Sequence, residues 1–254
     1  MITLDGHSTA VVKLQLESVI SYNMGLIKDV GKFVCSAPGS GTFTPDADYS
    51  LPASGENLVV RANQNINSET DIGITITGTG SDNAALVGNA VIKAQVAEGQ
   101  SYQVVPNRDG IKFKTISSVV ISNGILGDGF DICVLPDSAN DEVIAFDQGL
   151  TINPGKEIKP IYDKYNLDHN KRIRGDRTMS LSGFYTNNYT GLARINNREV
   201  TLRQDFKDDG GNSITEVVYV DKVRLGVTRE APSADDGECT VKGEGSYGRL
   251  FIFS

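Results

Sequence analysis

Tryptophan is absent from this 254-residue chain, and histidine and cysteine are scarce. The cysteines, Cys35, Cys133 and Cys239, lie far apart and form no CxxC spacing. This pattern argues against a disulfide framework or a structural zinc site, so we expect free thiols. The lack of tryptophan also argues against a carbohydrate-binding surface, because such surfaces use exposed aromatic platforms.

Long apolar runs are also missing. No stretch approaches the roughly 18 apolar residues that a membrane-spanning helix needs. The first residues lack the basic and then apolar segments of a secretory signal. We therefore expect no membrane partner and a protein that is made and kept in a cytosol.

Residue patterns that would support catalysis are not found. A Ser-His-Asp arrangement of His169 with Asp168 or Asp176 is an alternative, but a loop histidine is more often solvated. The Asp pairs lie in turn-like segments without the calcium-loop register, and no glycine motif fits a phosphate site. The sequence predicts no enzyme, no cofactor and no metal.

Glycine is abundant, with 27 residues, and Thr, Ser and Asn are frequent. This composition favours short strands and tight turns over helices. We predict an all-β chain with few short helices, built as antiparallel sandwiches or barrels in two β modules. The predicted strands of the first module lie near Leu58–Ala62, Ile72–Thr77, Ala90–Val96, Tyr102–Val105, Lys112–Ile121 and Asp131–Leu135.

The C-terminal third also alternates with a period of two residues. Its pattern places Val217, Tyr219, Val223 and Leu225 on one face of a strand. The weakly patterned, acidic segment Asp137–Asp147 suggests a module boundary, giving modules 1–147 and 148–254.

Two segments are predicted to be irregular. Cys35–Gly55 contains three prolines and reads as a long exposed loop. Gly149–Arg177 is the least regular stretch, with a short helix predicted at Ile161–Leu167, and Gly191–Arg198 could form a helical turn.

Charge is unevenly distributed along the chain. The formal net charge is −8, of which roughly −9 precedes Gln148 and roughly +1 follows. A DNA-gripping surface would be basic, so the acidity indicates either simple solubility or a wall that repels phosphates.

One basic cluster stands out: Lys171, Arg172, Arg174 and Arg177. It could be a solvated loop face. The other interpretation is a contact with acidic loops of a neighbouring subunit, since arginine pairs with carboxylates in a bidentate way. Asp208 and Asp209, in the predicted hairpin loop Gln204–Ser213, are candidate contacts of the same assembly.

Several segments carry a family resemblance. GDRTMSLSGFY (Gly175–Tyr185), ITEVVYVDKVRLGVTREAPSADDGE (Ile214–Glu238) and TVKGEGSYGRLFIFS (Thr240–Ser254) resemble tail tube proteins of tailed bacteriophages. DIGITITGTGSDNA (Asp71–Ala84) and IKFKTISSVVISNGILGDGFDICV (Ile111–Val134) resemble small β-sandwich modules of phage virion proteins.

The resemblance implies a virion subunit that forms hexameric rings. The rings would stack into a tube, assembled in the bacterial host cytoplasm, through which DNA passes without sequence-specific binding. The two irregular segments would then be mobile in the free subunit and ordered on stacking. Two alternatives remain open: a capsid decoration or head-to-tail connector protein, and a tail-associated carbohydrate-binding or hydrolytic protein.

Overall fold

The computed structural model describes residues 17–144, 150–153, 156–162, 168–174, 177–184, 194–207, 213–230 and 240–253. These residues form nineteen β-strands and one 3₁₀ turn, η1 (Ser138–Asn140). All strand pairs within the sheets are antiparallel. The predicted all-β fold class is therefore confirmed.

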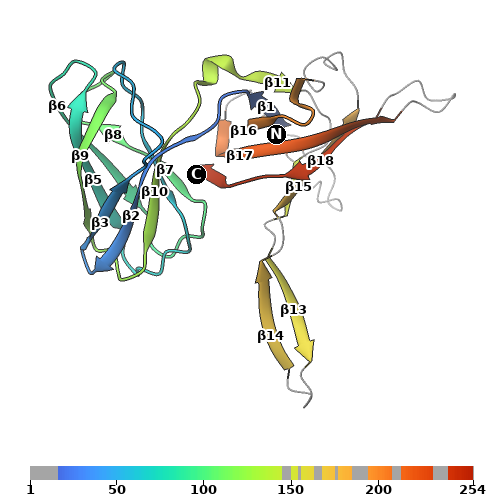
Figure 1. Cartoon of the computed structure of the whole chain (residues 1–254), viewed down its shortest axis with the longest axis horizontal. Helices are drawn as coiled ribbons and strands as arrows, with labels where there is room; N and C mark the ends of the chain where they lie inside the picture. The colour runs from blue at the N-terminus through green and yellow to red at the C-terminus, as the bar shows by residue number, and fades with distance from the viewer. Residues whose placement is uncertain are drawn as a thin grey trace, which may run out of the picture.

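Two sheets form a sandwich in the first half of the chain (Figure 1). One has the order β3 (Ser40–Pro45), β2 (Lys28–Ala37), β10 (Gly129–Val134), β4 (Val59–Ala62) and β7 (Ser101–Gln103). The other has the order β8 (Val105–Pro106), β6 (Ala85–Ile92), β5 (Ile72–Gly80) and β9 (Phe113–Ser122). Alternate residues of β5 are buried, as expected for a strand with one face on a core.

The sandwich core lies between these sheets. Phe33 and Phe130 from the first sheet pack in one cluster with Ile74, Leu86 and Phe113 from the second. Each of these side chains is at most 2% exposed. Burying a side chain of this size contributes about 1.5–3 kcal/mol, so this cluster is the main source of the sandwich's stability.

The remaining large sheet has eight strands. Its order is β11 (Glu142–Ile144), β1 (Glu17–Asn23), β16 (Glu199–Lys207), β17 (Ser213–Glu230), β18 (Thr240–Ser246), β15 (Thr178–Phe184) and β12 (Leu150–Asn153), with β19 (Leu250–Phe253) also paired to β17. A second core on this sheet includes Tyr22, Leu181, Leu202 and Val220.

The sandwich is inserted between two neighbouring strands of the large sheet. β1 and β11 pair directly, with Ile20 opposite Ile144, although the whole sandwich separates them in sequence. The two linkers are tied together because Asn23 Nδ2 donates hydrogen bonds to Asp137 O (2.9 Å) and Asp141 Oδ1 (2.7 Å). The predicted boundary at 147/148 therefore does not coincide with the division between sheets.

A β-bulge changes which residues of β17 are buried. Val218 and Val220 share the buried face with Val223 and Leu225, whereas Val217 and Tyr219 are only half-buried. The register with β16 shifts by one residue between Val220 and Val223, next to Lys222 with φ of 51°. The predicted face was wrong for Val217 and Tyr219 because the alternation was extended through this bulge.

The loop predicted at Cys35–Gly55 is wrong for residues 35–45 and is confirmed only for 46–55. β2 continues to Ala37, turns at Pro38-Gly39, and returns as β3 to Pro45. Gly39 has φ of 70°, a turn conformation that favours glycine. The prolines are compatible with this hairpin because Pro38 lies in the turn and Pro45 ends an edge strand.

The stretch Gly149–Arg177 is also more regular than predicted. β12, β13 (Lys156–Tyr162) and β14 (Asp168–Arg174) occupy most of it. The helix predicted at Ile161–Leu167 is wrong for Ile161 and Tyr162, which lie in β13, and 163–167 lie outside the described residues. The predicted turn at Gly191–Arg198 is described only from Arg194, where Arg194 and Ile195 have helical backbone.

Candidate functional site: a projecting hairpin and an ionic junction

β13 and β14 form a separate two-stranded hairpin. They pair only with each other among the described strands, and Figure 1 shows them standing apart from both larger units. A two-stranded hairpin is marginally stable in water on its own, since it lacks a second layer to bury its side chains.

The register of the hairpin places like charges opposite each other. Lys156 lies opposite Arg174, and Lys159 lies opposite Lys171. Like charges in directly opposed positions destabilise a strand pair. The two pairs are three residues apart along each strand, so they belong to opposite faces of the hairpin.

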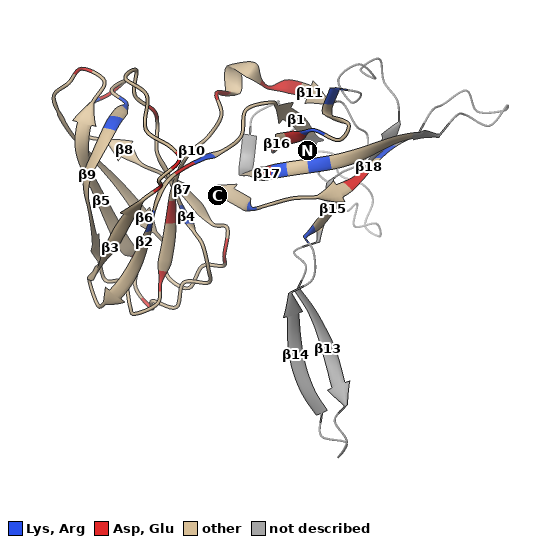
Figure 2. Cartoon of the chain, viewed as in Figure 1, with Lys and Arg blue, Asp and Glu red and all other residues tan. Residues whose placement is uncertain are grey.

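The hairpin also differs in charge from the rest of the chain. Residues 156–174 contain six Lys or Arg and three Asp or Glu, a formal charge of +3. Because the whole chain has a formal charge of −8, the residues outside this range together carry −11. Figure 2 shows acidic positions along the sandwich and its linkers. The hairpin and the rest of the chain thus carry net charges of opposite sign.

The structure separates the residues of the predicted basic cluster. Lys171, Arg172 and Arg174 lie together on β14. Arg177 lies beyond the hairpin, where its Nη2 donates to Glu98 Oε1 at 2.8 Å and its Nη1 donates to the Gly248 carbonyl. Arg177 therefore has partners within its own chain.

Asp208 and Asp209 lie outside the described residues, as does Asp176. His169 is placed opposite Ile161 in the hairpin register.

A buried ionic junction joins the sandwich to the large sheet. Arg61, on β4, is 2% exposed, and its Nε donates to the Leu250 carbonyl at 2.6 Å. Its Nη1 donates to Asp131 Oδ2 at 3.2 Å and its Nη2 donates to Glu98 Oε1 at 3.3 Å. One side chain of the sandwich thus contacts a carbonyl of the large sheet and two carboxylates.

Arg249 reaches into the same junction from the segment between β18 and β19. Its Nη1 donates to Asp29 Oδ1 at 2.6 Å and to Asp131 Oδ2 at 3.4 Å. Its Nη2 donates to Asp221 Oδ2 at 3.0 Å. Asp221 is fully buried, so this arginine supplies the charge that makes its burial tolerable.

Phe251 lies between the two arginines. The Arg61 and Arg249 guanidinium carbons each lie 5.3 Å from its ring centroid, within the range of a cation–π contact. Phe251 is fully buried in a cluster with Ile27, Val59 and Cys133. Backbone contacts add to the junction, because Ile252 N donates to Gly99 O at 2.9 Å.

The arginines change the acidity of their partners. Burial raises the pKa of Asp29, but the hydrogen bond and charge of Arg249 outweigh it and leave the pKa below its ordinary value. Burial also raises the pKa of Glu98, but the hydrogen bond and charge of Arg177 outweigh it, so this pKa too lies below its ordinary value. The contribution of these two carboxylates to the free energy of unfolding is therefore fully present above the ordinary carboxyl pKa. It is lost as the pH falls through their lowered pKa values in the folded protein.

Sequence reasoning missed this junction, although a signal for it exists. Asp131 and Asp221 interrupt the apolar strand sequences GFDICV and VVYVDKV, and Arg61 follows Val59-Val60. A charged residue inside an apolar strand is rarely buried without a partner. The pairing of these charges depends on which strands that are distant in sequence become neighbours in the fold, and the spacing of residues in the sequence does not reveal these neighbours.

No group of three or more potential metal ligands occurs in the part of the chain that the structure describes. Within the same residues, no helix is long and apolar enough to cross a membrane. Comparisons with protein-family models, curated proteins and solved structures find no match for this chain.

Cys35 and Cys133 should be unreactive in the folded protein. Burial, followed by the charge of Asp128, raises the pKa of Cys35 to about 11, and burial raises the pKa of Cys133 well above its ordinary value. At pH 8 the thiolate of Cys35 should be about a hundredfold rarer than in a free cysteine. In a Cys239→Ser variant, a thiol reagent such as DTNB should titrate both cysteines only after denaturant is added. Rapid reaction of the native protein would contradict this expectation.

Proposed function

We propose that this chain is a structural virion protein of a tailed bacteriophage, a tail tube subunit that assembles into stacked rings around a DNA channel. The observation that carries self-assembly is the β13–β14 hairpin. It has a basic sequence, like charges in opposed positions, and no sheet partner among the described strands. Copies of an otherwise acidic chain offer the complementary surface.

The assignment to a tail tube combines this observation with the sequence resemblance. In this proposal the large antiparallel sheet contributes to the wall of the channel, and the inserted sandwich is an additional module. The acidic balance supports a wall that DNA passes without sequence-specific binding, because phosphates are repelled. The proposed partners are other copies of the chain, in rings of the hexameric kind that the resemblance implies, and other virion proteins.

Catalysis is not part of this proposal. A hydrolase needs a nucleophile or a base held by an orienting partner. The described ion pairs connect arginine or lysine to carboxylates. The proposal therefore assigns the chain to assembly, with no substrate and no cofactor.

Electron microscopy of the purified full chain, with sedimentation over a range of concentrations, tests the proposal. We expect rings that stack into tubes as the concentration rises. Isolated rings or trimers without stacking would favour the capsid decoration or connector alternative. A strict monomer at high concentration would overturn the proposal.

A further inference from the structure

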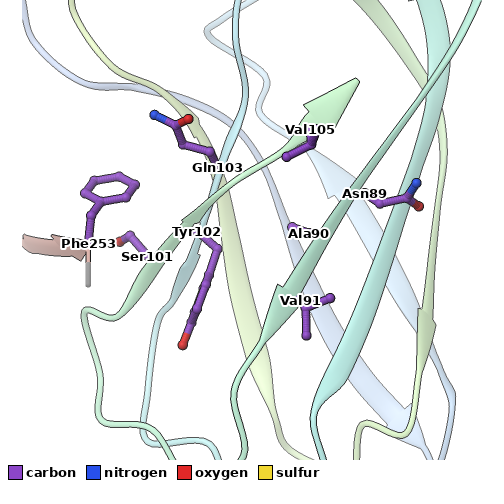
Figure 3. A pocket seen from close by; sticks show the side chains of 8 residues that line it. All are labelled: Asn89, Ala90, Val91, Ser101, Tyr102, Gln103, Val105 and Phe253. Carbon is purple, nitrogen blue, oxygen red and sulfur yellow. The ribbon is translucent and has the colours of Figure 1, made fainter. Parts of the chain in front are cut away.

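The apolar contact between the sandwich and the large sheet is small. Among the described residues the two large cores share no side chain, and a third cluster joins them, made of the buried Ile27, Val59, Cys133 and Phe251. Beside this cluster lies an open groove of about 480 Å³, lined by Phe253 of β19 together with residues of β6, β7 and β8 (Figure 3). Water therefore reaches one side of the contact, and ion pairs supply a large part of what holds the two units together.

Among the described residues, three ion pairs cross between the sandwich and the large sheet. Arg249 of the large sheet pairs with Asp29 at 2.6 Å and with Asp131 at 3.4 Å, both of the sandwich. Arg177, next to β15 of the large sheet, pairs with Glu98 of the sandwich at 2.8 Å. Each crossing pair thus joins an arginine of the large sheet to a carboxylate of the sandwich.

The two sides of the junction carry net charges of opposite sign. The sandwich side has three carboxylates and one guanidinium group, a formal −2, namely Asp29, Glu98, Asp131 and Arg61. The large-sheet side has one carboxylate and two guanidinium groups, a formal +1, namely Asp221, Arg177 and Arg249. These net charges attract each other across the contact.

Protonation of two carboxylates is enough to remove this attraction. With Asp29 and Glu98 neutral, two of the three crossing ion pairs are lost, and the sandwich side has a formal charge of zero. The large-sheet side stays positive, and Lys222, which also faces Asp29, adds to that charge. Cys133 beside Asp29 and Tyr247 beside Glu98 are neutral in acid and cannot replace the lost carboxylates.

We propose that the ionic junction is an acid-sensitive latch: below about pH 4 the sandwich detaches from the large sheet and stays tethered by its two linkers, while both large cores remain folded. The side chains of these cores are uncharged, so acid does not act on them directly. This device acts within one chain and is independent of the proposed self-assembly.

The direction of the pH dependence follows from the two carboxyl groups. The pKa values of Asp29 and Glu98 lie below the ordinary values of about 4. Both groups are therefore charged at neutral pH, and the attraction is fully present above the ordinary pKa. It is lost as the pH falls through the lowered values of the folded protein, so acid opens the latch.

Two native cysteines report this opening. Cys133 is fully buried in the cluster between the two units, whereas Cys35 is 1% exposed in the sandwich core. In a Cys239→Ser variant of the full chain, 4,4′-dithiodipyridine, which reacts with thiols in acid, should modify Cys133 when the latch opens. Peptide mapping identifies the modified cysteine, and the same reaction in denaturant gives the reference rate at each pH.

Acid should act selectively on Cys133. Between pH 7 and about pH 3.5, its protection relative to the denatured reference should fall at least about a hundredfold, because losing two charge-assisted contacts raises the population of the open form. The protection of Cys35 should change less than about threefold, since the sandwich core stays closed. Unchanged protection of Cys133, or equal loss at both cysteines, would overturn the inference.

Neutral isosteres test the same device without acid. The Asp29→Asn, Glu98→Gln variant should open at pH 7, with Cys133 modified and Cys35 protected. The matched control is Asp71→Asn, Asp82→Asn, which removes two carboxylates from exposed ion pairs elsewhere on the sandwich. Loss of Cys133 protection in this control to the same extent would show that net charge, and not the junction, governs the opening.

A disulfide across the contact provides the last test. Gln100 of the sandwich and Ile252 of β19 are bridge partners, so Gln100→Cys and Ile252→Cys can be joined by oxidation. In this locked chain Cys133 should stay protected at about pH 3.5, because the sandwich cannot leave the large sheet. Reaction of Cys133 as fast as in the unlocked chain would reject detachment of the sandwich as the cause of its exposure.

Discussion

Replacing Arg249 with alanine is expected to lower the free energy of unfolding by about 3–5 kcal/mol, the cost of removing one partner of a buried ion pair. Arg249 contacts Asp29, Asp131 and Asp221. Asp131 keeps Arg61, but Asp221 is fully buried and loses its charge partner. Oδ1 of Asp221 already lacks a hydrogen-bond partner, so the remaining carboxylate would be left poorly compensated.

Two further variants isolate the cause of this loss. Arg249→Met keeps an apolar side chain over Phe251 but leaves the carboxylates uncompensated, so it should be about as destabilising as Arg249→Ala. Lys93→Ala removes an exposed pair with Asp71 and should leave the free energy of unfolding nearly unchanged. Chemical denaturation of the three variants measures the differences. A loss below about 1 kcal/mol for Arg249→Ala, or full stability of Arg249→Met, would contradict the assigned role of the junction.

The sequence predicted the fold class and most strands because the alternation within one strand is a local property. β5 and β9 were expected near Ile72–Thr77 and Lys112–Ile121, and the structure places them at Ile72–Gly80 and Phe113–Ser122. The third predicted strand was displaced, since β6 ends at Ile92 and not at Val96. Its later residues form a turn at Ala94-Gln95, where Gln95 has φ of 53° without the Gly or Asn that usually signals such a turn.

What could not be predicted depends on contacts between distant segments. The pairing of β1 with β11 across the sandwich has no local signature, which is why a linear boundary was placed near residue 148. The junction has the same character, because Arg61 and Leu250 are 189 positions apart. The β13–β14 hairpin was predicted to be irregular because its charged residues mask the alternation of a strand. The same charged residues formed the predicted basic cluster, and Lys171, Arg172 and Arg174 of that cluster lie on β14.

Reversing two charges of the hairpin, with Arg172→Glu and Arg174→Glu, is expected to abolish assembly. Truncating one partner of a desolvated charge pair at an interface costs about 2–5 kcal/mol. Two reversals should therefore raise the concentration needed for half-assembly by at least about a hundredfold. The hairpin itself should survive, because Arg174 lies opposite Lys156 and its replacement by Glu turns a repulsive cross-strand pair into an attractive one.

The matched control reverses two exposed basic residues of the sandwich, Lys32→Glu and Lys112→Glu, with the same change in net charge. Sedimentation and electron microscopy should show assembly of this control and none of the hairpin variant. If the hairpin instead held DNA, the unmodified protein would bind duplex DNA with an affinity that falls steeply with salt. Tight DNA binding at physiological salt, together with normal assembly of the Arg172→Glu, Arg174→Glu variant, would show that the hairpin contacts phosphates and not neighbouring subunits.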